Sequence, residues 1–375
     1  MQMKDLVNAL RLDLPRALKL LEVMVNMDSP SDDKTLVDGL VHFLGSHFQS
    51  IGGAVEYVPS DRFGNHLIAR FNGPPAETRV LILGHTDTVF PAGEAEKRPF
   101  RIENGRAMGP GVFDMKAGIL LAWSALKALQ PLPRPVTVFL SSDEEAGSSS
   151  SRELIEREAG ASGTVLVLEP SLPGGALKTA RKGVGRFTVM ATGRAAHAGI
   201  DPSRGINAIQ EIAHQILQLQ RLTDPLRGTT MTVGLVRGGS RVNVVPAEAV
   251  IEIDVRASSN EEAARITEAI RALRPHLEGA ALHIRGGFNR PPMERTTETG
   301  RLFEIARIVA QELGFELQEG ATGGGSDGNF TSAIGVPTLD GLGPIGDGAH
   351  ALEEYVEIDS LPERAALIAG LISRV

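Results

Sequence analysis

Short apolar runs alternate with helix-periodic segments in the first half of the chain. Arg79–Leu83, Val136–Leu140 and Thr164–Leu168 are brief runs rich in Val, Leu and Ile, a pattern typical of buried strands. The other elements expected here are strands at Ala54–Val58 and Asn65–Phe71, and helices at Leu6–Val25, Thr35–Ile51, Lys116–Leu129 and Ser149–Glu158. This alternation predicts an α/β domain with a mostly parallel, mixed sheet and helices on both of its faces.

The order of elements changes between residues 181 and 288. It becomes strand, helix, strand, strand, helix, strand, at Arg186–Ala191, Ser203–Leu219, Thr229–Val236, Ala249–Arg256, Asn260–Leu273 and Ala281–Arg285. This βαββαβ order is typical of a ferredoxin-like α+β domain. The earlier pattern then resumes, with elements expected at Glu298–Leu313, Glu316–Gln318, Val336–Leu339 and Leu361–Ser373. We therefore predict one domain formed by residues 1–180 and 289–375, interrupted by an inserted domain at residues 181–288.

Composition narrows the chemistry that the chain can perform. Its 375 residues include no cysteine, so any metal must be bound by His, Asp or Glu. The net charge is −8 and no stripe of Lys and Arg is present, which argues against nucleic acid as a partner. No apolar run approaches the roughly 18 to 20 residues of a membrane span, and the amino-terminal residues do not resemble a signal peptide. We expect a cytoplasmic protein with neither a membrane nor a nucleic acid as partner.

Imidazole and carboxylate groups follow each of the three apolar strands and recur in two glycine-rich loops. They are His85, Asp87, Asp114, Glu144, Glu145, Glu169 and His350. The carboxyl ends of parallel strands meet at one edge of a sheet, so these groups are expected to converge. Converging carboxylates repel one another unless cations lie between them. A set of imidazoles and carboxylates without thiolates suits Zn²⁺, Mn²⁺ or Co²⁺.

Glu144 and Glu145 are adjacent in the sequence. Neighbouring residues of an extended segment point in opposite directions, so one of them can bind metal while the other serves as a general base. In a metal hydrolase that base takes a proton from the attacking water and later gives it to the leaving amine. The alternative, two solvated acids at the start of a helix, stays open on this observation alone.

Five segments together resemble the signature segments of the dinuclear metallo-exopeptidase and deacylase family. They are Gly84–Thr88, Gly111–Gly118, Asp143–Glu145, Leu168–Pro170 and Gly348–His350. That family includes glutamate carboxypeptidase, acetylornithine deacetylase, succinyl-diaminopimelate desuccinylase and aminoacylase. The resemblance covers essentially the whole chain and looks closest to the glutamate carboxypeptidase-like branch.

The resemblance implies two divalent metal ions per chain, expected to be zinc, with manganese or cobalt as alternatives. It implies that His85 and Glu169 bind one ion, that Glu145 and His350 bind the other, and that Asp114 bridges them. It also implies a cis peptide bond between Asp114 and Met115. Glu144 matches the general base of the family, and Asp87 matches the acid associated with the first histidine.

The inserted domain resembles the lid or dimerisation domain of the same family, which implies a homodimer formed through it. In the family, the histidine that His197 matches approaches the active site, often that of the partner subunit, and stabilises the oxyanion. Asn243 and Arg256 match polar groups on the lid side, although both could be ordinary residues of a sheet edge.

A substrate carboxylate needs a cation or backbone N–H groups to bind it. Arg290 could provide a bidentate contact, and the glycine-rich loop with Gly324, Gly325 and Ser326 could provide N–H groups. Three basic residues near the first domain crossing either favour an acidic side chain or are solvated: Lys178, Arg181 and Lys182.

The leading hypothesis is a metal-dependent hydrolase that removes a C-terminal amino acid from a small peptide or an N-acyl amino acid. The alternative within the family is an N-acyl amino acid deacylase of the acetylornithine deacetylase or aminoacylase type. A non-catalytic metal- or amino-acid-binding module is a third hypothesis, which the presence of Glu144 disfavours. A dinucleotide-binding enzyme is disfavoured because no Gly-x-Gly-x-x-Gly turn follows the first strand.

Overall fold

The computed structural model describes residues 3–75 and 77–375, and their contacts divide the chain into two units. The host unit comprises the described residues up to Thr179, together with Arg295–Ala321 and Ser326–Val375. The inserted unit comprises Ala180–Glu294 and Thr322–Gly325. The domain boundaries expected at residues 180/181 and 288/289 stay a prediction. No helix in the described ranges is long and apolar enough to cross a membrane.

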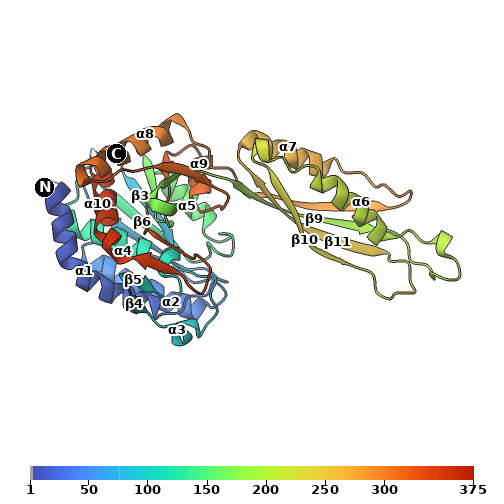
Figure 1. The fold of residues 1–375 in the computed structure, drawn as a ribbon, viewed down its shortest axis with the longest axis horizontal. Coiled ribbons are helices and arrows are strands. Elements are labelled where there is room, and N and C mark those ends of the chain that lie inside the picture. The colour runs from blue at the N-terminus through green and yellow to red at the C-terminus, as the bar shows by residue number, and fades with distance from the viewer. Residues whose placement is uncertain (1–2, 76) are drawn as a thin grey trace. The chain divides into compact units, whose positions relative to one another are not determined.

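A six-stranded mixed sheet forms the centre of the host unit (Figure 1). Its order is β1 (Ala54–Val58), β2 (His66–Phe71), β6 (Val136–Ser141), β3 (Val80–His85), β7 (Thr164–Val167) and β14 (Thr338–Leu339). The last four of these strands run parallel, whereas β1 and β2 are antiparallel to their neighbours. The predicted mostly parallel, mixed sheet is therefore confirmed, and β3, β6 and β7 end at the same edge.

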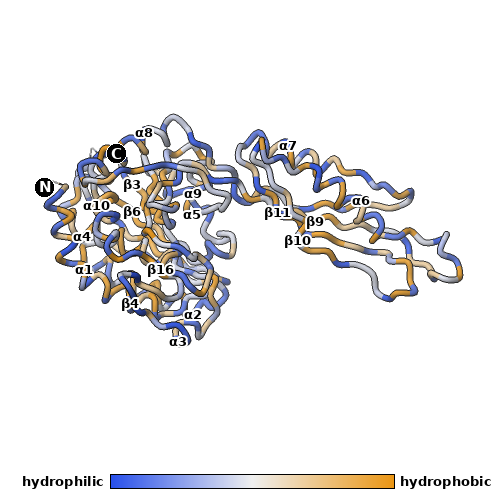
Figure 2. Tube along the Cα trace, in the orientation of Figure 1, coloured by the Kyte–Doolittle hydropathy of each residue, from blue (hydrophilic) through white to orange (hydrophobic). Residues whose placement is uncertain are grey.

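Helices cover both faces of this sheet. One face carries α1 (Met3–Val25), α2 (Lys34–Ser50), α4 (Ala117–Ala128), α8 (Thr297–Leu313) and α10 (Leu361–Ile372). The opposite face carries α5 (Arg152–Gly160) and α9 (Gly328–Ala333), which pack Ile155 and Phe330 against β-strand residues such as Phe139. Figure 2 shows hydrophobic residues gathered along β3 and β6. These strands are buried throughout because helices cover both sides.

A second, small sheet was not predicted from the sequence. It contains β15 (Gly346–Asp347), β16 (Tyr355–Glu357), β5 (Arg106–Met108) and β4 (Arg101–Glu103), with Tyr355 opposite Met108. The short helix α3 (Glu94–Lys97) precedes it. Because Asp114 follows β5 and His350 lies between β15 and β16, this sheet holds the two loops side by side.

The inserted unit has the predicted βαββαβ order. Its elements are β9 (Gly183–Thr192), α6 (Ala208–Gln220), β10 (Thr230–Gly238), β11 (Glu248–Ala257), α7 (Asn260–Arg271) and β12 (Ala281–Arg290). The sheet order is β10-β11-β9-β12, entirely antiparallel. Phe187, Ile251 and Ile266 belong to its separate core. The ferredoxin-like architecture is therefore confirmed, and it leaves β10 and β12 as edge strands.

Two strand predictions need correction. The strand predicted at Glu316–Gln318 is wrong: the strand is β13 (Glu319–Thr322), which pairs with β8 (Leu177–Arg181). The last strand of the inserted unit was expected to end at Arg285, but β12 continues to Arg290. The strand is longer because the backbone pairing of β12 with β9 continues past Gly286 and Gly287, with a shift of register near Arg290.

Candidate metal centre and active site

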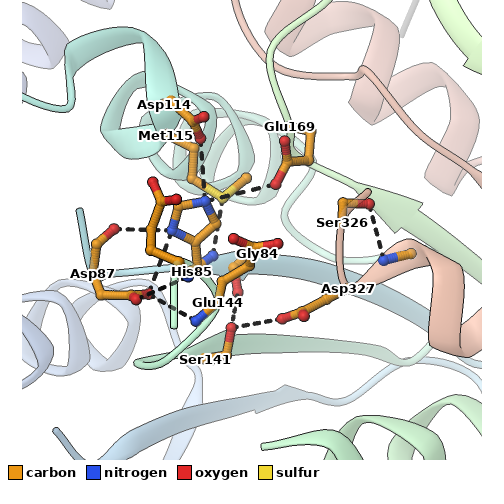
Figure 3. A network of polar contacts seen from close by, with 12 residues as sticks. Gly84, His85, Asp87, Asp114, Met115, Ser141, Glu144, Glu169, Ser326 and Asp327 are labelled. Atoms are coloured by element: carbon orange, nitrogen blue, oxygen red, sulfur yellow. Dashed lines mark hydrogen bonds and ion pairs between the residues drawn. The ribbon is translucent and has the colours of Figure 1, made fainter. Parts of the chain in front are cut away.

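His85 is the last residue of β3 and its side chain is buried. Its Nδ1 lies 2.9 Å from the backbone carbonyl oxygen of Asp87, which can only accept a hydrogen bond, so Nδ1 is the donor in this contact. Its Nε2 lies 3.1 Å from Asp114 Oδ1 and 3.6 Å from Glu169 Oε1 (Figure 3). The imidazole therefore presents Nε2 to two carboxylates, an orientation suited to metal binding.

Asp114 lies in the segment Val112–Lys116, directly before α4, where the backbone of Asp114 and Met115 is kinked and not helical. The Asp114–Met115 peptide bond is cis, which confirms the expectation drawn from the resemblance. Met115 then returns toward β3, where its Sδ accepts the backbone N–H of His85 at 2.9 Å. This contact fixes the turn against the end of the strand that carries His85.

Glu145 and His350 meet on the other side of Asp114. His350 Nε2 lies 3.1 Å from Glu145 Oε1 and 3.5 Å from Asp114 Oδ2. Two groups of residues therefore have ligand atoms within 4.8 Å of one another, namely His85, Asp114 and Glu169, and Asp114, Glu145 and His350. Asp114 belongs to both groups, as the predicted bridging position requires.

The electrostatics of this cluster fit the binding of cations. Hydrogen bonds with Asp114 and Glu145 raise the pKa of His350 to about 10. Burial by itself lowers the pKa of His85, but its contacts with carboxylates raise that pKa well above its usual value. Burial opposes ionisation of Asp114, yet the two histidines hold its pKa well below its usual range. A site that attracts positive charge this strongly suits divalent metal ions.

Asp87 lies behind the candidate ligands and holds the segment that follows β6. Its carboxylate accepts the backbone N–H groups of Glu144 at 3.2 Å and Glu145 at 3.1 Å, and the hydroxyl of Ser31 at 2.7 Å. Glu144 is largely buried and lies beside His85 and Asp87 (Figure 3). The two adjacent glutamates are thus fixed by a single carboxylate.

Two acidic residues near this centre were missed by the sequence analysis. Asp327 accepts hydrogen bonds from the hydroxyls of Ser141 and Ser148, and so connects the end of β6 to the start of α9. Glu354 is buried and accepts three backbone N–H groups from the loop that carries Asp114. Burial raises the pKa of Glu354 to about 7, although these N–H groups oppose that rise. An acidic pair follows His350 in the sequence, but nothing there shows which member is buried.

His197 and Asn243 lie on neighbouring segments of the inserted unit. The N–H of Ala198 donates to the carbonyl of Asn243 at 3.0 Å, and His197 forms a bridge with Val244. The His197 side chain is exposed, and its Nδ1 accepts the N–H of Gly199 at 3.1 Å. The two predicted lid residues are therefore brought together.

Two guanidinium groups contact the glycine-rich loop. Arg256 pairs with Asp254 at 2.8 Å and donates to the carbonyl of Gly323 at 3.4 Å. Arg181 donates to the carbonyls of Gly324 at 3.2 Å and Gly325 at 3.3 Å. Because Arg181 is buried, the suggestion that it is a solvated hinge residue is wrong.

Three further predicted residues have different surroundings. Lys178 is buried too, so it is not a solvated residue, whereas Lys182 is half-buried. Arg290 is buried and is the last residue of β12. Ser326 belongs to the host unit, where its N–H donates to Asn329 at 2.8 Å and its hydroxyl to Asp340 at 2.7 Å. Both donors of Ser326 are therefore engaged within the host unit, and its role in binding substrate stays a prediction.

The fold and this constellation define a metal-dependent hydrolase with a second domain inserted into the first. The chain belongs to peptidase family M20/M25/M40, whose model matches residues 81–374. It is 31% identical over 369 residues to carboxypeptidase G2 from a Pseudomonas species, covering 96% of this chain and 89% of the relative. It is 25% identical over 360 residues to acetylornithine deacetylase from Pasteurella multocida, covering 89% and 90% of the two chains.

Solved structures share the fold. An aminopeptidase from Bacillus cereus matches with a TM-score of 0.79 at 21% identity, covering 96% of this chain and 98% of its own. A metallo-carboxypeptidase of the same family from Sulfolobus solfataricus matches with a TM-score of 0.73 at 18% identity, covering 95% and 98%. Family membership makes the chain a hydrolytic metallo-exopeptidase or amidohydrolase of a family that binds divalent metals.

Proposed function

We propose that the chain is a carboxypeptidase-type hydrolase that cleaves the amide bond before the C-terminal amino acid of a small peptide or N-acyl amino acid. The observation that carries this proposal is the pair of ligand groups that share Asp114, with Glu144 beside them. The similarity to carboxypeptidase G2 supports the carboxypeptidase assignment.

The residues fit two divalent ions, for which zinc is the proposed metal because the ligand atoms are imidazole nitrogens and carboxylate oxygens. In this proposal His85 and Glu169 hold one ion, Glu145 and His350 hold the other, and Asp114 contacts both. When bound, such ions polarise the scissile carbonyl and lower the pKa of water.

Glu144 is the proposed general base. It is largely buried, so its carboxylate is shielded from bulk water, and the contact of its N–H with Asp87 fixes its backbone. In this role it takes a proton from the attacking water and delivers it to the leaving amine. A non-catalytic binding module would have no use for a carboxylate in this position.

The glycine-rich loop and Arg290 are the proposed binding groups for the substrate carboxylate. The carbonyl of Gly324 faces the guanidinium of Arg181. A trans peptide is planar and its N–H points away from its carbonyl, so the Gly325 N–H points away from Arg181. An anion could accept that N–H group. His197 is the proposed donor to the oxyanion, with Asn243 and Arg256 supporting the lid.

A homodimer through the inserted unit is part of the proposal. Its edge strand β10 exposes Leu235 (48%) and Val236 (60%), and the neighbouring helix α6 exposes Leu217 (64%). An exposed edge strand with apolar side chains is a ready surface for pairing with a second copy. Two-fold pairing of β10 with its counterpart would continue the sheet and cover these residues.

The alternative, an N-acyl amino acid deacylase, is supported by the similarity to acetylornithine deacetylase.

Metal removal and a panel of substrates test both the carboxypeptidase proposal and the deacylase alternative. We expect chelation to abolish hydrolysis and added Zn²⁺, Mn²⁺ or Co²⁺ to restore it, with metal content measured by mass spectrometry. Dipeptides should be cleaved faster than N-acetylornithine and other N-acetylated amino acids if the carboxypeptidase proposal is right. The reverse order would favour the deacylase, and full activity after verified metal removal would refute both.

A further inference from the structure

Glu354 joins two loops that carry candidate metal ligands. Its Oε1 accepts the N–H groups of Phe113 and Asp114, each at 2.8 Å, and its Oε2 accepts the N–H of Gly111, also at 2.8 Å. The side chain is fully buried. Hydrogen bonds from N–H groups to a carboxylate are among the stronger ones in proteins, so Glu354 fixes the backbone that presents Asp114.

The same residue terminates the loop that carries His350. This loop makes a turn in which the Ala351 N–H donates to the Gly348 carbonyl at 2.8 Å, and both Gly348 and His350 have positive φ. The His350 side chain is half-exposed, and β16 begins immediately after Glu354. Glu354 is therefore the buried anchor at the carboxyl end of an otherwise exposed turn.

His85 does not depend on Glu354 in this way. It is the terminal residue of a central strand, its side chain is buried, and its ring is fixed by the carbonyl of Asp87. The two histidines of the centre are consequently held by different means, one by the sheet and the other by a loop.

We propose that Glu354 is a positioning residue that holds His350 against Asp114, so that it determines the affinity of the group Asp114–Glu145–His350 for its metal ion. This inference rests on the metal centre proposed above. Residues that orient metal ligands typically contribute about 10- to 100-fold to metal affinity. Asp114 is common to both groups, but the sheet holds His85, so the group His85–Asp114–Glu169 should depend on Glu354 less.

The experiment is a titration of metal-free protein with Zn²⁺ in competition with a chromophoric chelator, which measures affinity without measuring activity. Glu354→Gln keeps the size of the side chain but replaces one acceptor oxygen with a donor, so it opposes at least one of the three N–H groups. The matched control is Glu353→Gln, the same change at the adjacent, exposed position. We expect the second equivalent of Zn²⁺ to bind about 10- to 100-fold more weakly in Glu354→Gln. Glu353→Gln should bind as the wild type does.

A second comparison separates positioning from a general loss of stability. In a His350→Ala background the second equivalent is already weakened, so adding Glu354→Gln should change its affinity little. Circular dichroism establishes that each variant folds, and Glu354→Asp replaces Glu354→Gln if the latter does not. Equal weakening of both equivalents, or an unchanged second equivalent, would overturn the proposal for Glu354. A wild-type protein that fails to bind two ions would instead refute the metal centre itself.

Discussion

Glu144 and Glu145 are held by one carboxylate but occupy different surroundings. Glu145 lies within the ligand group of His350, whereas Glu144 lies outside both ligand groups and beside His85. Removing the charge from each should therefore have different consequences, because one residue would bind metal and the other would transfer a proton.

We expect Glu144→Gln to retain both metal ions and to lose about 10²- to 10⁴-fold in kcat, the usual contribution of a general base. The measurement is kcat together with metal content by mass spectrometry. Glu145→Gln serves as the comparison, and it should lose metal as well as activity. If Glu144→Gln lost its metal, the proposed division of roles between the two glutamates would be reversed.

The sequence identifies the residues of the centre that follow apolar strands. His85, Glu144 and Glu169 lie at strand ends, and the parallel order of those strands requires that the ends converge. Glu354 and Asp327 could not be identified in this way, because their contacts are with backbone N–H groups and serine hydroxyls that are distant in the sequence. Spacing along the chain carries no signal for such contacts.

At the scale of elements, long buried strands and amphipathic helices were predictable and the short exposed strands were not. β4 and β5 have three residues each and β15 has two, too few to show a period of two. The pairing of β15 and β5 with β16 is decided by the tertiary position of the His350 loop rather than by local sequence preference. The unpredicted sheet is nevertheless the one that holds Asp114 and His350 together.

Helix α7 offers a test of how charge stabilises an element outside the centre. Glu262, in its first turn, accepts hydrogen bonds from Arg265, Thr229 and Arg227. The hydrogen bonds from Arg265 in particular lower the pKa of Glu262 to about 2. A carboxyl group whose pKa is lower in the folded state stabilises that state above its unfolded pKa, and this contribution disappears as pH falls toward the folded pKa.

We therefore expect Glu262→Gln to destabilise the inserted unit at pH 7 by about 1.5 to 3 kcal/mol, the usual value for hydrogen bonds to a charged group. The difference from the wild type should shrink as pH falls from about 5 to about 2. Hydrogen exchange of the α7 amides, followed by mass spectrometry, measures this locally. Glu261→Gln is the matched control, since Glu261 is the exposed neighbour in the same turn. A difference that persisted unchanged at low pH would contradict the assignment.

At the scale of the whole molecule, the proposed dimer raises the question of which chain would supply His197, the proposed oxyanion donor, to each active site. We expect His197→Ala to lower kcat while leaving metal content unchanged. If the histidine acts across the dimer, mixing His197→Ala with Glu144→Gln should restore activity. In such a heterodimer one site keeps Glu144 and receives an intact His197.

With random exchange of subunits, about a quarter of all sites would regain both residues, since half of the dimers are mixed and each has one complete site. Activity of the mixture is measured after subunit exchange has been verified by mass spectrometry of differently labelled chains. Each variant incubated alone under the same conditions is the control. No recovery in a mixture that exchanges subunits would show that His197 acts within its own chain or has no catalytic role.

The insertion of one unit into the other also fixes the order in which the protein can be completed during synthesis. The host unit needs residues from both sides of the insertion, and β14 and α10 follow it. The inserted unit is nearly contiguous, so most of it emerges from the ribosome before the host sheet has its last strand. Domains generally fold as units during translation, and a growing chain that already contains His85, Asp114 and Glu169 still lacks His350. The nascent protein thus passes through a stage at which only one of its two ligand groups exists.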